Sequence, residues 1–84
     1  MSKPKLIRKN LALSQKFTTF LLDNPKFIVD LPNTAKYIML SADDKELNAE
    51  NQKLANSIMN QGGKVVIVKE KKKHGSNISF EFAV

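Results

Sequence analysis

The first third of the chain carries apolar side chains at helical spacing. Apolar or amide residues recur every three or four positions, at Leu6, Asn10, Leu13, Phe17, Phe20 and Leu21. This spacing predicts an amphipathic helix over about residues 4–22, with Ile7 and Leu11 widening the apolar stripe. Pro4 suits the first helical position, and Pro25 ends the helix because the residue before a proline is pushed out of the helical region.

Three shorter segments have the composition of strands. Residues 36–40 and 64–69 contain nearly continuous apolar runs, which are typical of strands buried on both faces. Residues 78–84 alternate between apolar and mostly polar positions, which predicts a strand with one buried face. Phe80 and Phe82 belong to that apolar face, so we interpret them as core residues and not as a platform for stacked bases.

A second helix is predicted between the first two strands. Ser41 stands three residues before Asp44, an arrangement that resembles a capping box at the amino end of a helix. The inward positions of this helix are Leu47, Asn51, Leu54, Ala55 and Ile58. Gly62-Gly63 ends the helix near residue 61, since glycine accepts the left-handed conformation found there.

The elements follow the order α-β-α-β-β within a single domain that spans residues 1–84. The central βαβ unit predicts a right-handed crossover and parallel pairing, and the last two strands predict an antiparallel hairpin. The fold class is therefore α/β, bordering on α+β: a three-stranded mixed sheet with two main helices. We expect the crossover helix to cover one face of the sheet, and either the first helix or a second copy of the protein to cover the other.

Composition excludes several kinds of chemistry. The 84 residues contain no cysteine, which rules out disulfides, thiolate catalysis and cysteine-bound metal. His74 is the single histidine, so neither a metal site nor a nucleophile–base pair can be assembled from recognisable parts. No apolar run approaches the ~18 residues that a membrane span requires. We therefore expect a cytoplasmic protein that is not an enzyme, with no cofactor, no metal and no membrane partner.

Positive charge gathers towards the two ends of the chain. The net charge is +6, and the slightly acidic middle third separates two basic segments. The candidate nucleic-acid-binding residues are Lys69, Lys71, Lys72 and Lys73 at the predicted hairpin, with Arg8 and Lys9 on the first helix. Lysine clusters bind phosphate backbones by releasing counterions. The alternative is a solvated loop whose lysines prevent strands from pairing edge to edge.

A small sheet with apolar residues on both faces favours self-association. The candidate interface residues are Met39, Val66, Val68 and Asn51. A buried Asn51 would need partners and could fix the register of an interface, whereas at the stripe's edge it would reach solvent. These features indicate a non-enzymatic binding or accessory module that acts as a homo-oligomer, most simply a dimer. The alternatives are a nucleic-acid-binding protein and a module that binds a larger protein partner.

Several phrases together resemble a known family. They are Lys9-Asn10-Leu11-Ala12-Leu13-Ser14, Phe17, Pro25, Ala35 to Leu40, Leu47-Asn48, Asn51, Leu54 and Gly63 to Lys69. The chain is similar over roughly residues 5–70 to a family of short bacterial and archaeal proteins of unknown function. The resemblance implies the α-β-α-β-β order, and it brings no activity, cofactor or binding residue with it.

Overall fold

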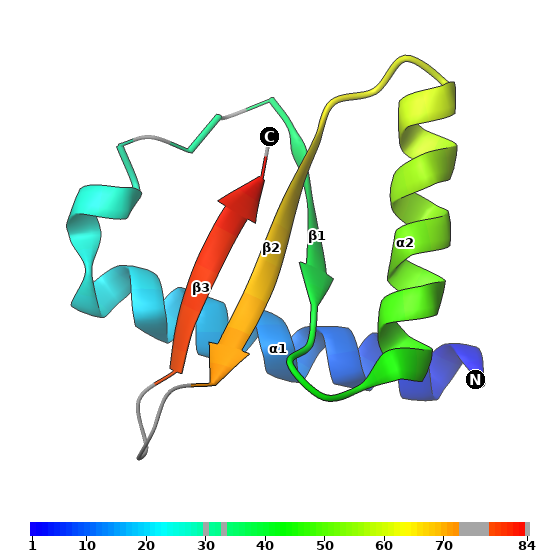
Figure 1. Cartoon of the computed structure of the whole chain (residues 1–84), viewed down its shortest axis with the longest axis horizontal. Coiled ribbons are helices and arrows are strands. Elements are labelled where there is room, and N and C mark those ends of the chain that lie inside the picture. The colour runs from blue at the N-terminus through cyan, green and yellow to red at the C-terminus, as the bar shows by residue number, and fades with distance from the viewer. Residues whose placement is uncertain (30, 33, 73–77, 84) are drawn as a thin grey trace.

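The computed structural model describes residues 1–29, 31–32, 34–72 and 78–83. Its elements are α1 (Lys3–Asp23), the short 3₁₀ helix η1 (Pro25–Phe27), β1 (Lys36–Leu40), α2 (Lys45–Asn60), β2 (Val65–Lys72) and β3 (Ile78–Ala83). Figure 1 shows this order along the chain, which confirms the predicted α-β-α-β-β arrangement.

The three strands form one mixed sheet in the order β1-β2-β3. β1 and β2 are parallel, with Met39 opposite Val68, and β2 and β3 are antiparallel, with Val68 opposite Phe82. The β-branched run at the start of β2 occupies the centre of the sheet, where such side chains pack best. The predicted sheet is confirmed.

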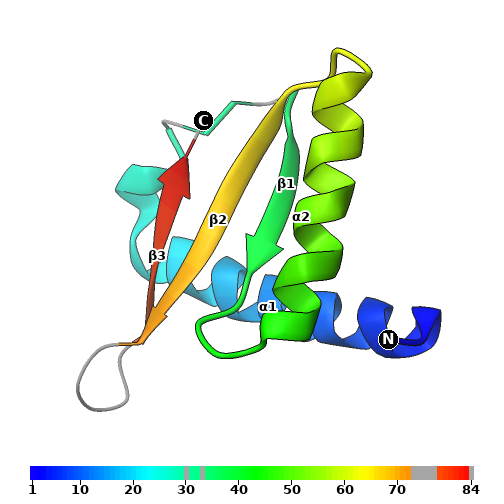
Figure 2. The same ribbon diagram turned by 45° about the vertical axis from the view of Figure 1, so that its right-hand side comes forward.

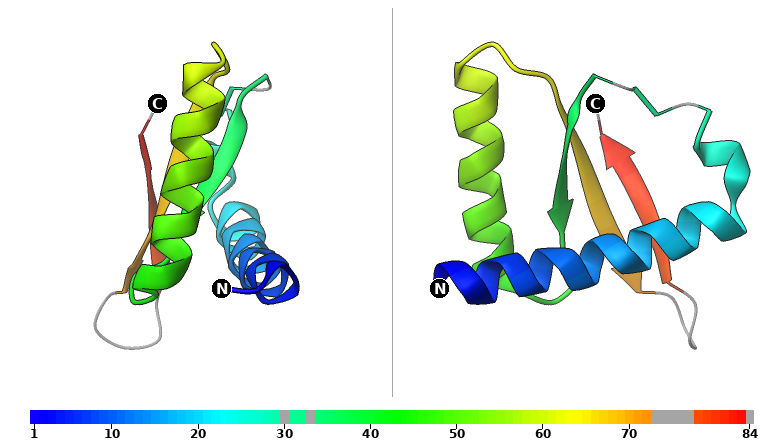
Figure 3. Two further views of the ribbon diagram at one scale, coloured as in Figure 1. Left: turned by 90° about the vertical axis from the view of Figure 1, so that its right-hand side faces the viewer. Right: turned by 180° about the vertical axis from the view of Figure 1, so that it is seen from behind.

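Helix α1 covers one face of this sheet. Figure 3 shows it running across the strands on that side. The register places Met39, Val68 and Phe82 on the covered face, and Phe17 of α1 packs edge to face against Phe80 and Phe82, with ring centroids 5.1 and 5.6 Å apart. The two phenylalanines of β3 are therefore core residues, as the alternation of β3 predicts.

Helix α2 lies beside β1 (Figures 2 and 3) and leaves much of the second face of the sheet uncovered, although Ile38 of β1 is buried on that face. The expectation that the crossover helix would cover a whole face is wrong. Asn51 donates a hydrogen bond of 2.7 Å to the carbonyl of Met39, so α2 is held against the strand's outer edge. Ala55 is fully buried, and its small side chain allows this close approach. Ile67 of β2 is consequently only half-buried on the second face, and Lys69 is exposed there.

The helix ends follow local chemistry, with one departure from prediction. The cap of α2 is Asp44, whose carboxylate accepts from the backbone N–H of Leu47 at 3.1 Å, and Ser41 is not the cap. Gly62 ends the helix at φ 83°, a conformation that favours glycine. Among the helices of the described residues, none is long and apolar enough to cross a membrane.

Candidate functional site

The carboxyl ends of the parallel strands β1 and β2 meet the amino end of α2 and the middle of α1. In open α/β sheets this is where ligands usually bind. Cavities of about 180 and 430 Å³ flank the loop from Ser41 to Asp44. The polar residues around this loop, named here the carboxyl-end cluster, are Lys9, Lys16, Ser41, Asp43, Asp44, Glu70 and Lys72.

Glu70 is the buried centre of this cluster. It lies opposite Phe80 in the β2–β3 register, so its side chain shares the face that α1 covers, and it is 4% exposed. One carboxylate oxygen, Oε1, accepts from the backbone N–H of Ala42 at 3.0 Å and from the Ser41 hydroxyl at 3.4 Å. The other, Oε2, has no hydrogen-bond donor among the described residues and lies 3.5 Å from the Lys16 ammonium. An internal carboxylate thus holds the position that an anionic ligand would take beside this loop.

Each acid of the cluster has a lysine of its own. Lys9 binds Asp44 at 2.6 Å, and Lys72 binds Asp43. The Lys72 hydrogen bond, helped by Ser41, holds the pKa of Asp43 below its usual value, and the Lys9 hydrogen bond, helped by the Leu47 N–H, lowers the pKa of Asp44. Asp43 in turn raises the pKa of Lys72. Together with Lys16 and Glu70, these pairs balance the cluster's charge and tie α1 and β2 to the loop before α2.

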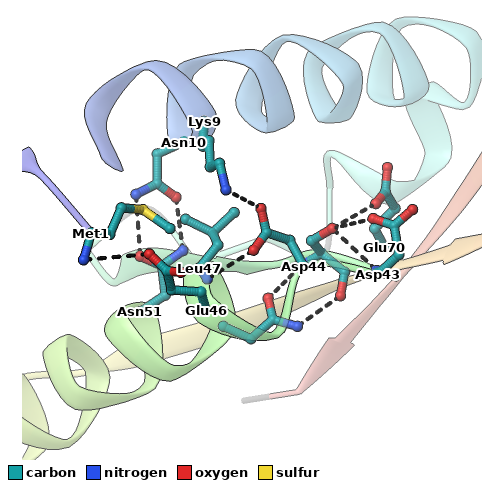
Figure 4. A network of polar contacts seen from close by, with 11 residues as sticks. Met1, Lys9, Asn10, Asp43, Asp44, Glu46, Leu47, Asn51 and Glu70 are labelled. Carbon is teal, nitrogen blue, oxygen red and sulfur yellow. Dashed lines mark hydrogen bonds and ion pairs between the residues drawn. The ribbon is translucent and has the colours of Figure 1, made fainter. Parts of the chain in front are cut away.

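A second polar contact joins the two main helices. Asn10 and Asn51 exchange two hydrogen bonds, of 3.1 and 2.8 Å (Figure 4). Asn51 also donates a hydrogen bond to the Met39 carbonyl. Asn51 is 3% exposed, so it is a buried amide with its partners in place. Asn51 thus sets the relative positions of α1, α2 and β1 within one subunit. Nearby, the amino group of Met1 lies 3.3 Å from Glu46.

The arrangement is suited to holding elements together. The Ser41 hydroxyl donates to Asp43 at 3.1 Å, but no described imidazole stands beside it to act as a base. Across the described part of the chain, no three histidine, cysteine, aspartate or glutamate side chains gather in a group that could hold a metal ion. Each acid in the cluster is paired with a lysine.

The predicted nucleic-acid residues do not form one surface. Lys69 and Lys71 are exposed on the sheet face away from α1, and Lys71 lies 3.7 Å from Glu81. Lys72 and Lys9 lie on the α1 side, each with an aspartate partner. Arg8 is exposed on α1, and Lys73 lies outside the described residues, as does His74. Lys71 and Lys72 belong to β2, so the prediction that both lie in the hairpin loop is wrong.

The predicted interface residues lie inside the subunit. Met39, Val66 and Val68 are buried in the core shared with α1, and Asn51 is buried between the helices. They offer no surface to a second copy. The sequence analysis missed Glu70 as a buried residue, although a signal exists: it continues the two-residue alternation of Val66 and Val68 and so falls on their face.

Removing the Asn10–Asn51 contact should lower the free energy of unfolding, and the effects of changing the two asparagines should not simply add. Asn51→Ala leaves the Met39 carbonyl and the Asn10 amide without their partner, and should lower the free energy of unfolding by about 1–3 kcal/mol in urea denaturation. The double variant with Asn10→Ala should show a coupling of at least about 0.5 kcal/mol. Gln52→Ala, a change at the exposed neighbour, is the control and should stay within about 0.5 kcal/mol. If the two asparagine changes lowered the free energy of unfolding by amounts that simply add, Asn10 and Asn51 would not interact in solution.

The aspartate pairs should respond to pH in a defined direction. Because the folded-state pKa values of Asp43 and Asp44 are lowered, both pairs stabilise the fold above the ordinary aspartate pKa of about 3.9. That contribution is lost as the pH falls through the lowered folded values. In carboxyl-carbon NMR titrations, Lys72→Met should raise the pKa of Asp43 and leave Asp44 low. Lys9→Met should raise that of Asp44 only in part, since Leu47 still donates to it. If the pKa of Asp43 did not change in the Lys72→Met variant, the ion pair between Asp43 and Lys72 would not form in solution.

Comparisons with known proteins give one match. A search of curated proteins and a search of solved structures each found none. A family model described as "Family of unknown function (DUF5647)" matches residues 5–79, which include α1, β1, α2, β2 and the start of β3. The match covers nearly the whole chain, so the protein belongs to this family of unknown function.

Proposed function

We propose that the chain is a non-enzymatic binding module that works as a homodimer. The observation that carries the proposal is the number of large apolar side chains left on its surface. Among the described residues these are Ile7, Leu11, Leu22, Ile28, Val29, Tyr37, Leu54 and Met59, each at least 40% exposed. Single exposed apolar residues are ordinary, but several on one side of a small protein mark an interaction surface.

The small core gives a reason for association. A chain of 84 residues buries only somewhat more than ~60% of its unfolded surface. With no cysteine it has no disulfide to add stability. A second copy that covers the exposed apolar side chains would supply burial that the single chain lacks.

The carboxyl-end cluster supports binding over catalysis in this proposal. At the position where an α/β domain commonly holds a ligand, lysines and acids of the chain neutralise one another. The Glu70 carboxylate also accepts a hydrogen bond from the backbone N–H of Ala42 in this loop. The cluster therefore serves to fix the fold on which a binding surface is carried. We propose the cytoplasm as its compartment, because a chain without cysteine fits a reducing environment.

Analytical ultracentrifugation from low to high micromolar concentration tests the homodimer. We expect a mass twice that of the chain at the upper concentrations. The midpoint of unfolding in urea should rise with protein concentration, because dimerisation stabilises the folded state by mass action. A monomer mass throughout, together with a midpoint that does not depend on concentration, would overturn the proposal.

Nucleic-acid binding is the second candidate, favoured by the net charge of +6 and by Lys69 and Lys71 exposed on the open face of the sheet. Fluorescence anisotropy with labelled DNA and RNA at about 50 and 200 mM salt tests it. Binding should weaken with salt, and it should weaken further in a variant with Lys69→Gln and Lys71→Gln. Lys53→Gln on α2 is the control. Equal binding by both variants, or none by the native chain, would remove this candidate.

A further inference from the structure

Helix α1 has a second apolar row that its own sheet does not use. Ile7, Leu11 and Leu22, named here the outer stripe, are 59%, 57% and 73% exposed. They fall at spacings that return to one side of a helix, and the exposed small side chains of Ser14 and Thr18 lie between them. The buried row of α1 includes Leu13 and Phe17 and lies on a different side of the helix.

The outer stripe faces away from the carboxyl-end cluster. Lys9 and Lys16 reach Asp44 and Glu70 from one side of the buried row, and the helical period puts the outer stripe beyond its other side. Two more exposed apolar side chains lie on the neighbouring elements β1 and α2. Tyr37, 40% exposed, shares the α1 face of β1 with Met39, and Leu54, 51% exposed, lies two helical turns from the buried Leu47.

The charges of α1 run against its own dipole. Its first turn contains no acid and its last turn no base, whereas Lys3 and Lys5 stand at the amino end and Asp23 at the carboxyl end. Positive side chains at the positive end of a helix, and a negative one at the negative end, are each unfavourable. A second α1 laid antiparallel would bring the carbonyl end of the partner's helix beside the basic amino end, and symmetry would do so twice. A parallel neighbour would instead bring like charges together.

From the outer stripe and this reversed charge, we propose that α1 packs antiparallel against α1 of a second copy, about a two-fold axis near Ser14. The inference rests on the proposed homodimer and names its interface. Ile7 lies opposite Leu22 of the partner subunit, and Leu11 lies opposite Thr18 of the partner subunit. The small residues at the centre let two helices approach to the usual ~8–10 Å between axes. The contact is isologous, as most dimer contacts are.

Engineered cysteines test the orientation, because the native chain has none. Chains with Ile7→Cys and chains with Leu22→Cys, distinguished by mass, are mixed and oxidised. We expect the mixed disulfide dimer and little of either self-linked dimer, since a disulfide needs Cα atoms within about 7 Å. Met59→Cys, on a comparably exposed apolar residue of α2, is the control and should not cross-link. Self-linking of the Ile7→Cys chains would mean parallel helices and would overturn the proposal.

A charge in the outer stripe gives an independent test. In a symmetric dimer Leu11→Arg places two arginines in the interface, one from each subunit. It should therefore raise the dissociation constant of the dimer at least tenfold, while Met59→Arg should change that constant less than twofold. Circular dichroism checks that both variants fold. A native dimer that Leu11→Arg leaves intact, or that forms no mixed disulfide, would overturn this interface and leave the homodimer standing. A native chain that stays monomeric would overturn both.

Discussion

The packing of α1 across the sheet is the contact on which the other features of this fold depend. The sheet carries the core residues Met39, Val66, Val68 and Phe80 on one face, and α1 is the element that covers them. The helix is held at three points that differ in chemistry: aromatic rings against β3, an amide pair against α2, and ion pairs against the loop after β1. Edge-to-face ring contacts add roughly 0.5–1.5 kcal/mol per pair beyond area burial.

Helix α1 also supplies lysines that pair with acids at the position where an α/β domain usually binds its ligand. Lys9 and Lys16 extend from α1 to the loop where β1 ends, and there they meet carboxylates from α2 and β2. Glu70 bonds the loop amide that would otherwise face a ligand. The polar side chains around this loop thus join elements of the fold to one another. The apolar side chains of the outer stripe remain exposed on α1. This distribution of polar and apolar side chains supports the proposed homodimer.

Much of this arrangement could be read from sequence, and the parts that could not depend on contacts between distant residues. The β-branched run of β2 and the alternation of β3 predicted the sheet correctly. The helical period of α2 correctly identified Leu47, Asn51 and Ala55 as inward residues, whereas Leu54, also predicted to face inward, is 51% exposed. The period also does not say what the inward residues contact, and here Asn51 contacts a strand edge. Ser41 and Asp44 are both competent caps. The choice of Asp44 follows from the bonds of Ser41 to Asp43 and Glu70, which bring in a residue far along the chain. Lys71 and Lys72 read as loop, yet pairing with Ser79 and Ile78 extends β2 through them.

The contact between Phe17 and Phe80 also bears on how the chain is made. Because α1 precedes β3 in the chain, the ribosome produces the helix well before the strand whose rings hold it to the sheet. Until then both apolar rows of α1 are uncovered on the nascent chain, which is the state in which chaperones bind and aggregation begins. Such distant contacts also raise the contact order and slow folding compared with a helical bundle of this length. The contact that holds α1 to the sheet therefore forms only after β3 has been made, between two elements far apart in the sequence.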